Sequence, residues 1–157
     1  MVLGLIIKMI FKEITAYNQF FNVLPIDWQE SILPSWKIYE KTTKCYVLQE
    51  NDKLIAGGLV FSECPPDMLY AKEEADSWFE NDYFYLGFIY VLEEKRGQNL
   101  GSIWLSNLKN INPKQKYWLT IEDLGLHNFY TKNGFKKVKS MFNDSQEEII
   151  YCFEGIK

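Results

Sequence analysis

The chain has 157 residues, the length of one ordinary domain and too few for two separate cores with a linker. Hydrophobic residues make up 47% and aromatic residues 17%, which is enough to fill a core and excludes disorder as the overall state. The 17 basic and 21 acidic side chains give a net charge of −4, which disfavours a general binder of nucleic acid. We therefore expect one folded domain, residues 1–157.

The charge is distributed unevenly along the chain. Residues 65–82 carry six acids against one base, a charge of −5, whereas residues 93–140 carry nine bases against four acids, a charge of +5. The first segment suits a cation and the second an anion. A solvated surface that keeps the protein soluble explains either segment equally well.

The three cysteines, Cys45, Cys64 and Cys152, are far apart and show no C-x-x-C spacing. Neither a disulfide framework nor a metal site is indicated, and reduced thiols in the cytoplasm fit best. The apolar run at residues 1–11 is interrupted by Lys8 and has no basic start or small-residue cleavage site, so it predicts a strand rather than a leader. No apolar run approaches the ~20 residues that span a bilayer, and no membrane partner is expected.

The first half of the chain alternates strand-like and helix-like segments. The predicted strands are residues 5–11, 44–49 and 53–61. The predicted helical segments are residues 15–23, 27–39 and 67–80. Pro25 and Pro34 argue against one long helix, and turn residues around Asn51 predict a hairpin that ends before Pro65.

The second half begins with residues 83–92, which are apolar at almost every position and predict a central strand covered on both faces. The further predicted strands are residues 116–121, 135–142 and 147–153. The predicted helices are residues 102–111 and 123–132, the second capped by Asp123 and ended by Gly134. The pattern is that of an α/β chain.

The loop between the apolar strand and the next helix contains Gly97 and Gly101. A strand that feeds a short turn and then a helix exposes backbone N–H groups that can hold phosphate oxygens. The Walker A pattern and the G-x-G-x-x-G fingerprint are both absent. The loop alone is equally compatible with a connection that holds no ligand.

Two segments together resemble motifs A and B of the GNAT superfamily of N-acetyltransferases. Arg96, Leu100 and Gly101 match the first motif, Arg/Gln-x-x-Gly-x-Gly/Ala, with Leu100 in its apolar position. Residues 129–135, Phe-Tyr-Thr-Lys-Asn-Gly-Phe, match the Phe-Tyr-x-Lys-x-Gly-Phe ending of the second. The resemblance implies an α/β (α+β) GNAT-like single domain with a mixed central sheet of about six or seven strands flanked by helices.

The resemblance implies acetyl-CoA as co-substrate. In this family the pantetheine arm of the cofactor pairs with the first motif strand as a neighbouring strand would. The resemblance therefore implies that Ile89 and Val91 make backbone contacts with the pantetheine arm. It also implies that a backbone N–H near Ile89 or Tyr90 stabilises the oxyanion. The implied cofactor-binding residues are Ile89, Tyr90, Val91, Arg96, Gly97, Gln98, Asn99, Leu100, Gly101, Ser102 and Asp123. Asn99 replaces the first motif glycine and Asp123 the usual Asn, and both changes are expected to weaken cofactor binding.

The resemblance also implies direct attack of an amine on the thioester in a ternary complex. A lysine-like amine has a pKa of roughly 10.4, so a base must remove its proton. The candidate bases are Glu80, Asp82 and Glu122. Tyr130 matches the family tyrosine that protonates the leaving thiolate, whereas the lone His127 is expected to be a packed or surface residue.

We therefore predict an N-acetyltransferase that moves an acetyl group from acetyl-CoA to a primary amine. The acidic residues 65–82 are expected near the acceptor, which favours a cationic one. The acceptor is left open between a small molecule and a protein amine, and a homodimer is left open as well. The alternatives are a non-catalytic acyl-CoA-binding or sensor domain of the same fold, and an α/β domain that binds no CoA.

Overall fold

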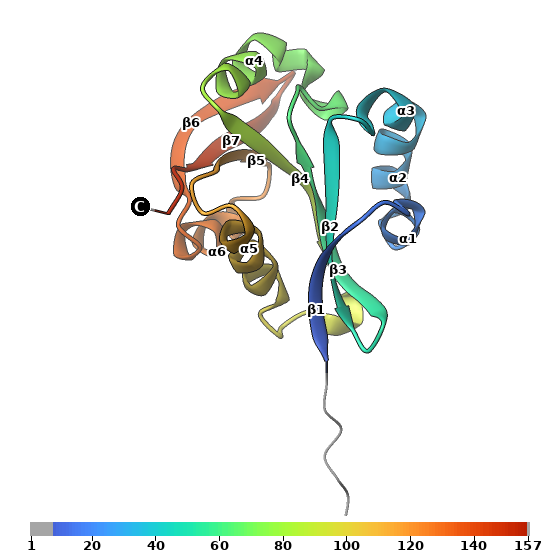
Figure 1. The fold of residues 1–157 in the computed structure, drawn as a ribbon. Coiled ribbons are helices and arrows are strands. Elements are labelled where there is room, and N and C mark those ends of the chain that lie inside the picture. Colours follow the sequence, from blue (N-terminus) through green and yellow to red (C-terminus); the bar gives the residue numbers. More distant parts are fainter. Residues whose placement is uncertain (1–7, 157) are drawn as a thin grey trace, which may run out of the picture.

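The computed structural model describes residues 8–156. Its strands form one sheet in the order β1-β2-β3-β4-β5-β7-β6, in which β4 and β5 are parallel and all other neighbours antiparallel (Figure 1). The strands are β1 (Met9–Ile14), β2 (Thr43–Glu50), β3 (Lys53–Phe61), β4 (Tyr83–Val91), β5 (Lys116–Ile121), β6 (Lys136–Asn143) and β7 (Gln146–Phe153). The expected mixed sheet of an α/β fold is confirmed. The predicted first strand begins in residues 5–7, which lie outside the described part of the chain.

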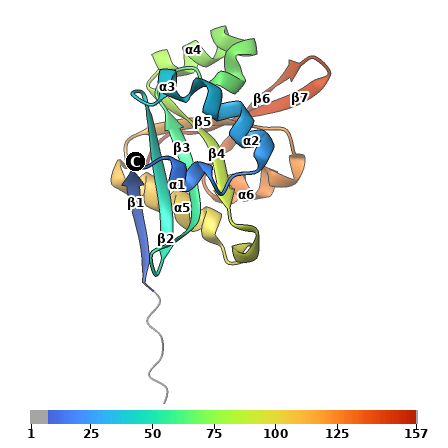
Figure 2. The ribbon, with the colours of Figure 1, turned by 90° about the vertical axis from the view of Figure 1, so that its right-hand side faces the viewer.

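Helices cover both faces of the sheet. They are α1 (Asn18–Phe21), α2 (Ile26–Ile32), α3 (Trp36–Tyr39), α4 (Lys72–Glu80), α5 (Leu100–Ile111) and α6 (His127–Lys132). Figures 1 and 2 show α1, α2 and α3 on one face and α5 and α6 on the other. None of the helices within residues 8–156 is long and apolar enough to cross a membrane.

Short 3-10 turns join several of these helices. They are η1 (Leu33–Ser35), η2 (Pro66–Ala71), η3 (Glu93–Lys95) and η4 (Leu124–Leu126). The prolines break the helical segments as predicted, because Pro25 precedes α2 and Pro34 lies in η1. Asp123 is a cap, as predicted, and its side chain accepts a 2.8 Å hydrogen bond from the Gly125 N–H. It caps η4 rather than α6, so the predicted single helix is divided in two.

Alternate side chains of the central strands pack into two separate cores, one on each face of the sheet. In β5, Trp118 packs with residues of α1 to α4, whereas Tyr117 and Leu119 pack with α5 and α6. In β7, Ile150 and Tyr151 divide in the same way. This alternation follows from the two-residue period of a strand.

The β4 and β5 strands pair over only three positions. Tyr83, Phe84 and Tyr85 pair with residues 116–118, and beyond Tyr85 the two strands have no register with each other. Within β4 only Tyr85 and Leu86 are fully buried. The prediction of a central strand covered on both faces is confirmed, because Phe88 and Tyr90 pack against one core and Ile89 and Val91 against the other. What is open beyond Tyr85 is the edge of β4 that faces β5.

Candidate active site

The gap between β4 and β5 leads into two adjoining pockets. The first, here called the basic pocket, has a volume of about 690 Å³. Its lining contains three basic side chains and no acidic one. The lining residues are Pro25, Trp28, Ile89, Tyr90, Val91, Lys95, Arg96, Gly97, Asn99, Leu100, Gly101, Leu126, Phe129, Tyr130 and Lys132.

The second, here called the acidic pocket, has a volume of about 480 Å³. Its lining contains five carboxylates and no basic side chain. The lining residues are Asp27, Trp28, Ser31, Asp67, Tyr85, Leu86, Gly87, Phe88, Ile89, Leu119, Thr120, Ile121, Glu122, Asp123, Leu126, Tyr130 and Glu148. The two pockets therefore have opposite charge.

Four residues line both pockets and mark their junction: Trp28 of α2, Ile89 of β4, Leu126 of η4 and Tyr130 of α6. The Tyr130 side chain is 8% exposed, and no residue of 8–156 makes a hydrogen bond to its hydroxyl group. Burial raises the pKa of Tyr130 to about 12, so the hydroxyl group is protonated at neutral pH. It can act as a proton donor where the two pockets meet.

A β-bulge interrupts β4 beside this junction. Two residues of β4, Phe88 and Ile89, lie opposite the single residue Gly58 of β3. Phe88 has a φ of +55°, a left-handed conformation that bulky residues rarely adopt. The strain is local and lies at the pocket wall, where Phe88 contacts the Trp28 ring edge-on with centroids 6.0 Å apart. The bulge takes backbone groups of β4 out of the regular ladder next to Tyr130.

The loop before α5 has the backbone shape of an anion-binding turn. Gly97 and Asn99 have positive φ values of +82° and +64°, and α5 begins directly after Asn99. The substitution of the first motif glycine is therefore tolerated, because Asn adopts the left-handed region more readily than most residues. A Cβ atom on Gly101 would lie 2.9 Å from the Phe129 ring, so glycine allows α5 and α6 to pack closely.

The basic side chains of the loop are held in place. The Arg96 Nε–H donates to the Val91 carbonyl at 3.2 Å, and its guanidinium lies 5.3 Å from the centroid of the Tyr90 ring. Lys95 forms a 2.8 Å ion pair with Glu50 of β2. The open N-terminus of α5 and these cations together favour an anion.

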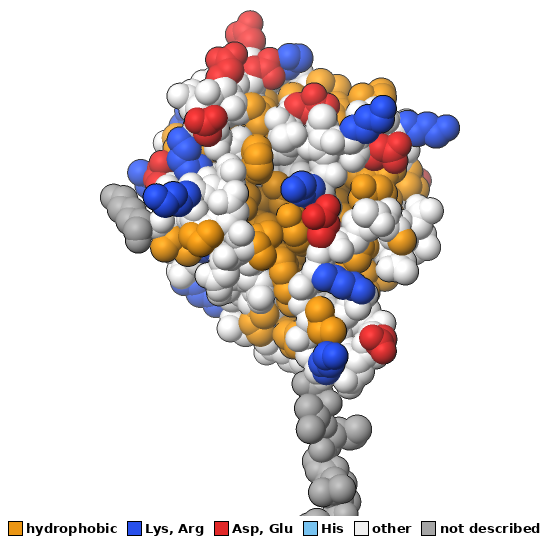
Figure 3. Space-filling view, viewed as in Figure 1, with side chains coloured by type: hydrophobic (Ala, Val, Ile, Leu, Met, Phe, Trp, Pro, Cys, Tyr) orange, Lys and Arg blue, Asp and Glu red, His pale blue; other side chains and the backbone are white. Residues whose placement is uncertain are grey.

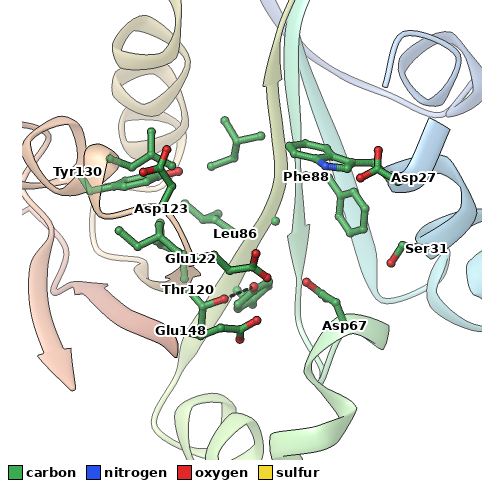
Figure 4. A pocket seen from close by; sticks show the side chains of 17 residues that line it. Asp27, Ser31, Asp67, Leu86, Phe88, Thr120, Glu122, Asp123, Tyr130 and Glu148 are labelled. Atoms are coloured by element: carbon green, nitrogen blue, oxygen red, sulfur yellow. Dashed lines mark hydrogen bonds between the residues drawn. The ribbon is translucent and has the colours of Figure 1, made fainter. Parts of the chain in front are cut away.

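In the acidic pocket, η2 and β7 bring two carboxylates together. Figure 4 shows Asp67, Glu122 and Glu148 on facing walls of the pocket. Glu148 is 8% exposed, and one of its oxygens accepts a hydrogen bond from the Tyr70 hydroxyl. Burial, with repulsion from Glu122, raises its pKa, and this hydrogen bond opposes the rise. Desolvation of the carboxyl group, together with repulsion from Glu148 and Glu122, raises the pKa of Asp67 to about 6, although the residue keeps part of its surface exposed to solvent.

The pKa of Asp67 gives a testable dependence of stability on pH. The folded-state pKa exceeds the unfolded value of ~3.9, so folding favours the protonated form and the free energy of unfolding falls as pH rises from about 4 to about 6. We expect an Asp67→Asn variant to have a slightly higher Tm than the wild type at pH 7 and the same Tm near pH 4. Thermal unfolding between pH 4 and pH 7 measures the difference in Tm. A wild-type Tm that rises above that of the variant as pH increases would contradict the prediction.

The structure gathers most of the predicted cofactor residues around the basic pocket. Eight of them line it: Ile89, Tyr90, Val91, Arg96, Gly97, Asn99, Leu100 and Gly101. Gln98 is exposed and Ser102 accepts a 3.0 Å hydrogen bond from the Asn133 side chain, and neither lines a pocket. Asp123 lines the acidic pocket instead, so its negative charge is not in the wall of the basic one.

Only some of the predicted catalytic residues line a pocket. Tyr130 and Glu122 line the acidic pocket. Glu80, at the C-terminal end of α4, and Asp82 are exposed and line neither pocket. His127 also lines neither, and its Nδ1 lies 2.5 Å from the Tyr151 hydroxyl oxygen, which agrees with a packed residue.

The acidic segment 65–82 contributes less to the pocket than expected. Of its six acids, only Asp67 lines the acidic pocket. The others lie on α4 or its C-terminal connection, and Figure 3 shows acidic side chains gathered over α4 at the top of the view. The other four carboxylates come from α2, from the residues that follow β5, and from β7. Asp27 and Glu148 could not be singled out because nothing in the sequence distinguishes them from the neighbouring acids Glu30 and Glu147.

Comparison with known proteins agrees with this geometry. The model of the acetyltransferase (GNAT) family matches residues 11–135. The chain belongs to the GNAT family. Acetyl-CoA is the cofactor of this family. A comparison with curated protein sequences found no match.

Solved structures of GNAT proteins share the fold at low sequence identity. A GNAT family acetyltransferase from Elizabethkingia anophelis with acetyl-CoA bound is 17% identical, covers 93% of this chain and 97% of its own, and has a TM-score of 0.58. The ribosomal-protein-S18-alanine N-acetyltransferase from Escherichia coli is 13% identical, covers 96% of each chain, and has a TM-score of 0.65. An aminoglycoside 6'-N-acetyltransferase complexed with coenzyme A is 13% identical, covers 91% of this chain and 95% of its own, and has a TM-score of 0.67. The last two of these proteins are named for different acceptors, so the shared fold does not identify the acceptor here.

Proposed function

We propose that the chain, as one domain over residues 1–157, is an acetyl-CoA-dependent N-acetyltransferase that acts on a primary, cationic amine by direct attack in a ternary complex. The observation that carries the proposal is the junction of two pockets of opposite charge at the buried Tyr130 hydroxyl group. An anionic phosphate-rich cofactor suits one pocket and a cationic amine the other. Their reactive ends would meet at Tyr130.

The basic pocket supports the cofactor half of the proposal. Free backbone N–H groups at the start of α5, between Gly97 and Gly101, would hold the pyrophosphate, and Arg96 and Lys132 would add positive charge. The edge of β4 after Tyr85 has no strand partner on its β5 side, so it can bind an extended amide chain such as pantetheine. Acetyl-CoA supplies the activated acetyl group.

The junction supports the chemical step. The attacking nitrogen lone pair would form a bond to the acetyl carbon, and the carbon–sulfur bond would break with its electron pair on sulfur. A backbone N–H beside the Phe88 bulge, near Ile89 or Tyr90, would stabilise the oxyanion. The Tyr130 hydroxyl group would then donate its proton to the thiolate and be reprotonated from solvent.

Removal of the amine proton requires a base on the acceptor side. Glu122 follows directly after β5, lines the acidic pocket and is exposed to solvent that can carry the proton away. We assign this role to Glu122 rather than to Glu80 or Asp82, because those two carboxylates line neither pocket. The proton would leave either directly or through one water molecule.

The proposal is tested by mixing the purified chain with acetyl-CoA and a panel of amines. We expect CoA release together with an amide product that mass spectrometry identifies as the acetylated amine. Initial rates at several concentrations of both substrates should give intersecting double-reciprocal lines, as a ternary complex requires. Saturable acetyl-CoA binding without transfer to any amine would favour the sensor alternative and contradict the proposal.

A further inference from the structure

We infer that the acceptor carries a second positive charge, and that Asp67 and Glu148, at the end of the acidic pocket away from the basic one, bind it. The inference rests on the proposed function and specifies its substrate class: an aliphatic diamine or polyamine, with one amine at Tyr130 and another ammonium group between Asp67 and Glu148. Both carboxylates line the acidic pocket (Figure 4).

The first argument is that neither Asp67 nor Glu148 is paired with a basic side chain in the described part of the chain. All ion pairs found within residues 8–156 involve other acids, so neither Asp67 nor Glu148 has a basic partner there. Glu148 is a buried carboxylate, and a buried charge without a cation is costly. Glu148 and Asp67 also repel each other and Glu122. An ammonium group between them would remove this repulsion.

The second argument is the hydrogen bond that holds Glu148 in place. One of its oxygens accepts a hydrogen bond from the hydroxyl group of Tyr70, and its carboxyl group also lies within hydrogen-bonding reach of Glu122. Tyr70 and Asp67 both belong to η2, so this short turn fixes the two carboxylates relative to each other. Two ionised carboxylates cannot donate a hydrogen bond to each other, so the remaining acceptor sites of Glu148 are open to a donor from a ligand. The buried Glu148 carboxylate is therefore held in a fixed position beside Asp67.

The third argument comes from the other end of the pocket. Tyr130 is more than nine-tenths buried, lines the same pocket, and has a hydroxyl group without a hydrogen-bond partner among residues 8–156. Figure 4 shows Tyr130 on one wall and Asp67 and Glu148 at the opposite end of the pocket. A ligand that reaches both places must therefore carry polar groups at two separated positions.

The wall between the two ends is largely apolar. Trp28, Leu86, Phe88 and Leu126 line it, and the Trp28 and Phe88 rings pack edge to face. Methylene groups would bury apolar surface against these side chains, and an ammonium group gains further from an aromatic face. No group of three or more His, Cys, Asp or Glu side chains within residues 8–156 is arranged to hold a metal ion. The lining therefore matches an aliphatic chain with cationic ends.

The test compares diamines with monoamines of equal length. Acetyl transfer to diaminobutane and diaminohexane is measured beside butylamine and hexylamine, in the wild type and in Asp67→Asn and Glu148→Gln variants. Each variant keeps the side-chain shape and removes one charge, and Gln can still accept the Tyr70 hydrogen bond. The control is Asp52→Asn, which removes the same charge in the exposed β2–β3 turn, where a φ of +69° suits Asn.

We expect the wild type to prefer a diamine to its monoamine by about tenfold or more in kcat/KM, as hydrogen bonds to a charged group allow. Each pocket variant should lose most of this preference, because its rate with the diamine should fall much more than its rate with the monoamine, whereas Asp52→Asn should keep both rates. Equal losses for diamine and monoamine would overturn the inference. So would a wild type without preference, which leaves the proposed acetyl transfer standing.

Calorimetric titration of the CoA-saturated protein with diaminohexane distinguishes failure of the second cation site from failure of the proposed acetyl transfer. Binding to the wild type that is lost in the double variant Asp67→Asn/Glu148→Gln supports the second cation site even if no amine is acetylated. Absence of binding and of preference together overturns the site. Displacement of the diamine by Mg²⁺ at equal concentration would also overturn it, because the site would then select charge density rather than an organic cation.

Discussion

A Tyr130→Phe variant should lose roughly 10²- to 10⁴-fold in kcat, the range that general acid catalysis contributes. Its affinity for acetyl-CoA should stay within about twofold, because the ring keeps its edge contacts with Phe129 and Phe135, whose centroids lie 4.9 and 5.7 Å away. Steady-state kinetics give kcat, and calorimetric titration with acetyl-CoA gives the affinity. Equal losses in both would show that Tyr130 is a binding residue rather than the proton donor.

A matched variant and the pH dependence sharpen this test. Tyr151→Phe removes a buried hydroxyl group that contacts His127 outside both pockets, so its kcat should not change. Because burial raises the pKa of Tyr130 to about 12, its hydroxyl group stays protonated through neutral and mildly alkaline pH. The wild-type kcat should therefore show no loss of a proton donor below about pH 10. A decline that appears in the wild type and disappears in Tyr130→Phe would contradict this assignment.

An Asn99→Asp variant should separate the stability of the fold from the affinity for the cofactor. Asp tolerates the left-handed conformation of Asn99, and a negative charge at the start of α5 favours the helix, so Tm should stay equal or rise slightly. The same charge would repel the pyrophosphate, and acetyl-CoA affinity should fall by about tenfold or more. The loss should shrink as salt is added, since salt screens exposed charges.

Two further variants control this prediction. Asn110→Asp adds the same charge at the exposed C-terminal end of α5, away from the loop, and should leave acetyl-CoA affinity unchanged. Asn99→Gly keeps the backbone conformation without a side chain and should bind at least as tightly as the wild type. Thermal unfolding and calorimetric titration measure both quantities. Loss of Tm and affinity together in Asn99→Asp would mean that the loop has unfolded.

Much of the fold could be predicted from local patterns in the sequence. The hairpin around Asn51, the helical breaks at Pro25 and Pro34 and the cap at Asp123 depend on interactions within a few residues, and the structure contains each of them. The mixed sheet and the cofactor loop were predicted from the resemblance of two short motifs to the family. Strand order is a property of the family fold, and no local pattern in the sequence encodes it.

The acceptor side was much harder to predict. Glu148 is one of two adjacent acids on β7, and only the three-dimensional pairing of β7 with β5 and the packing of η2 place it beside Asp67. The acidic segment 65–82 suggested the right sign of charge, but none of its α4 acids lines the pocket. The left-handed Phe88 was not predicted either, because its conformation depends on the register between β3 and β4 and not on its own preference.

The short pairing of β4 with β5 has a consequence for aggregation. Beyond Tyr85, free strand edges lie in the interior of the sheet rather than at its border, where unpaired edges usually recruit other chains. Trp28 and Leu126 stand on opposite sides of the opening, and side chains of an incoming strand would have to pass between them. The unpaired backbone groups of β4 can therefore hydrogen-bond to a narrow ligand, whereas a strand of another polypeptide chain cannot reach them.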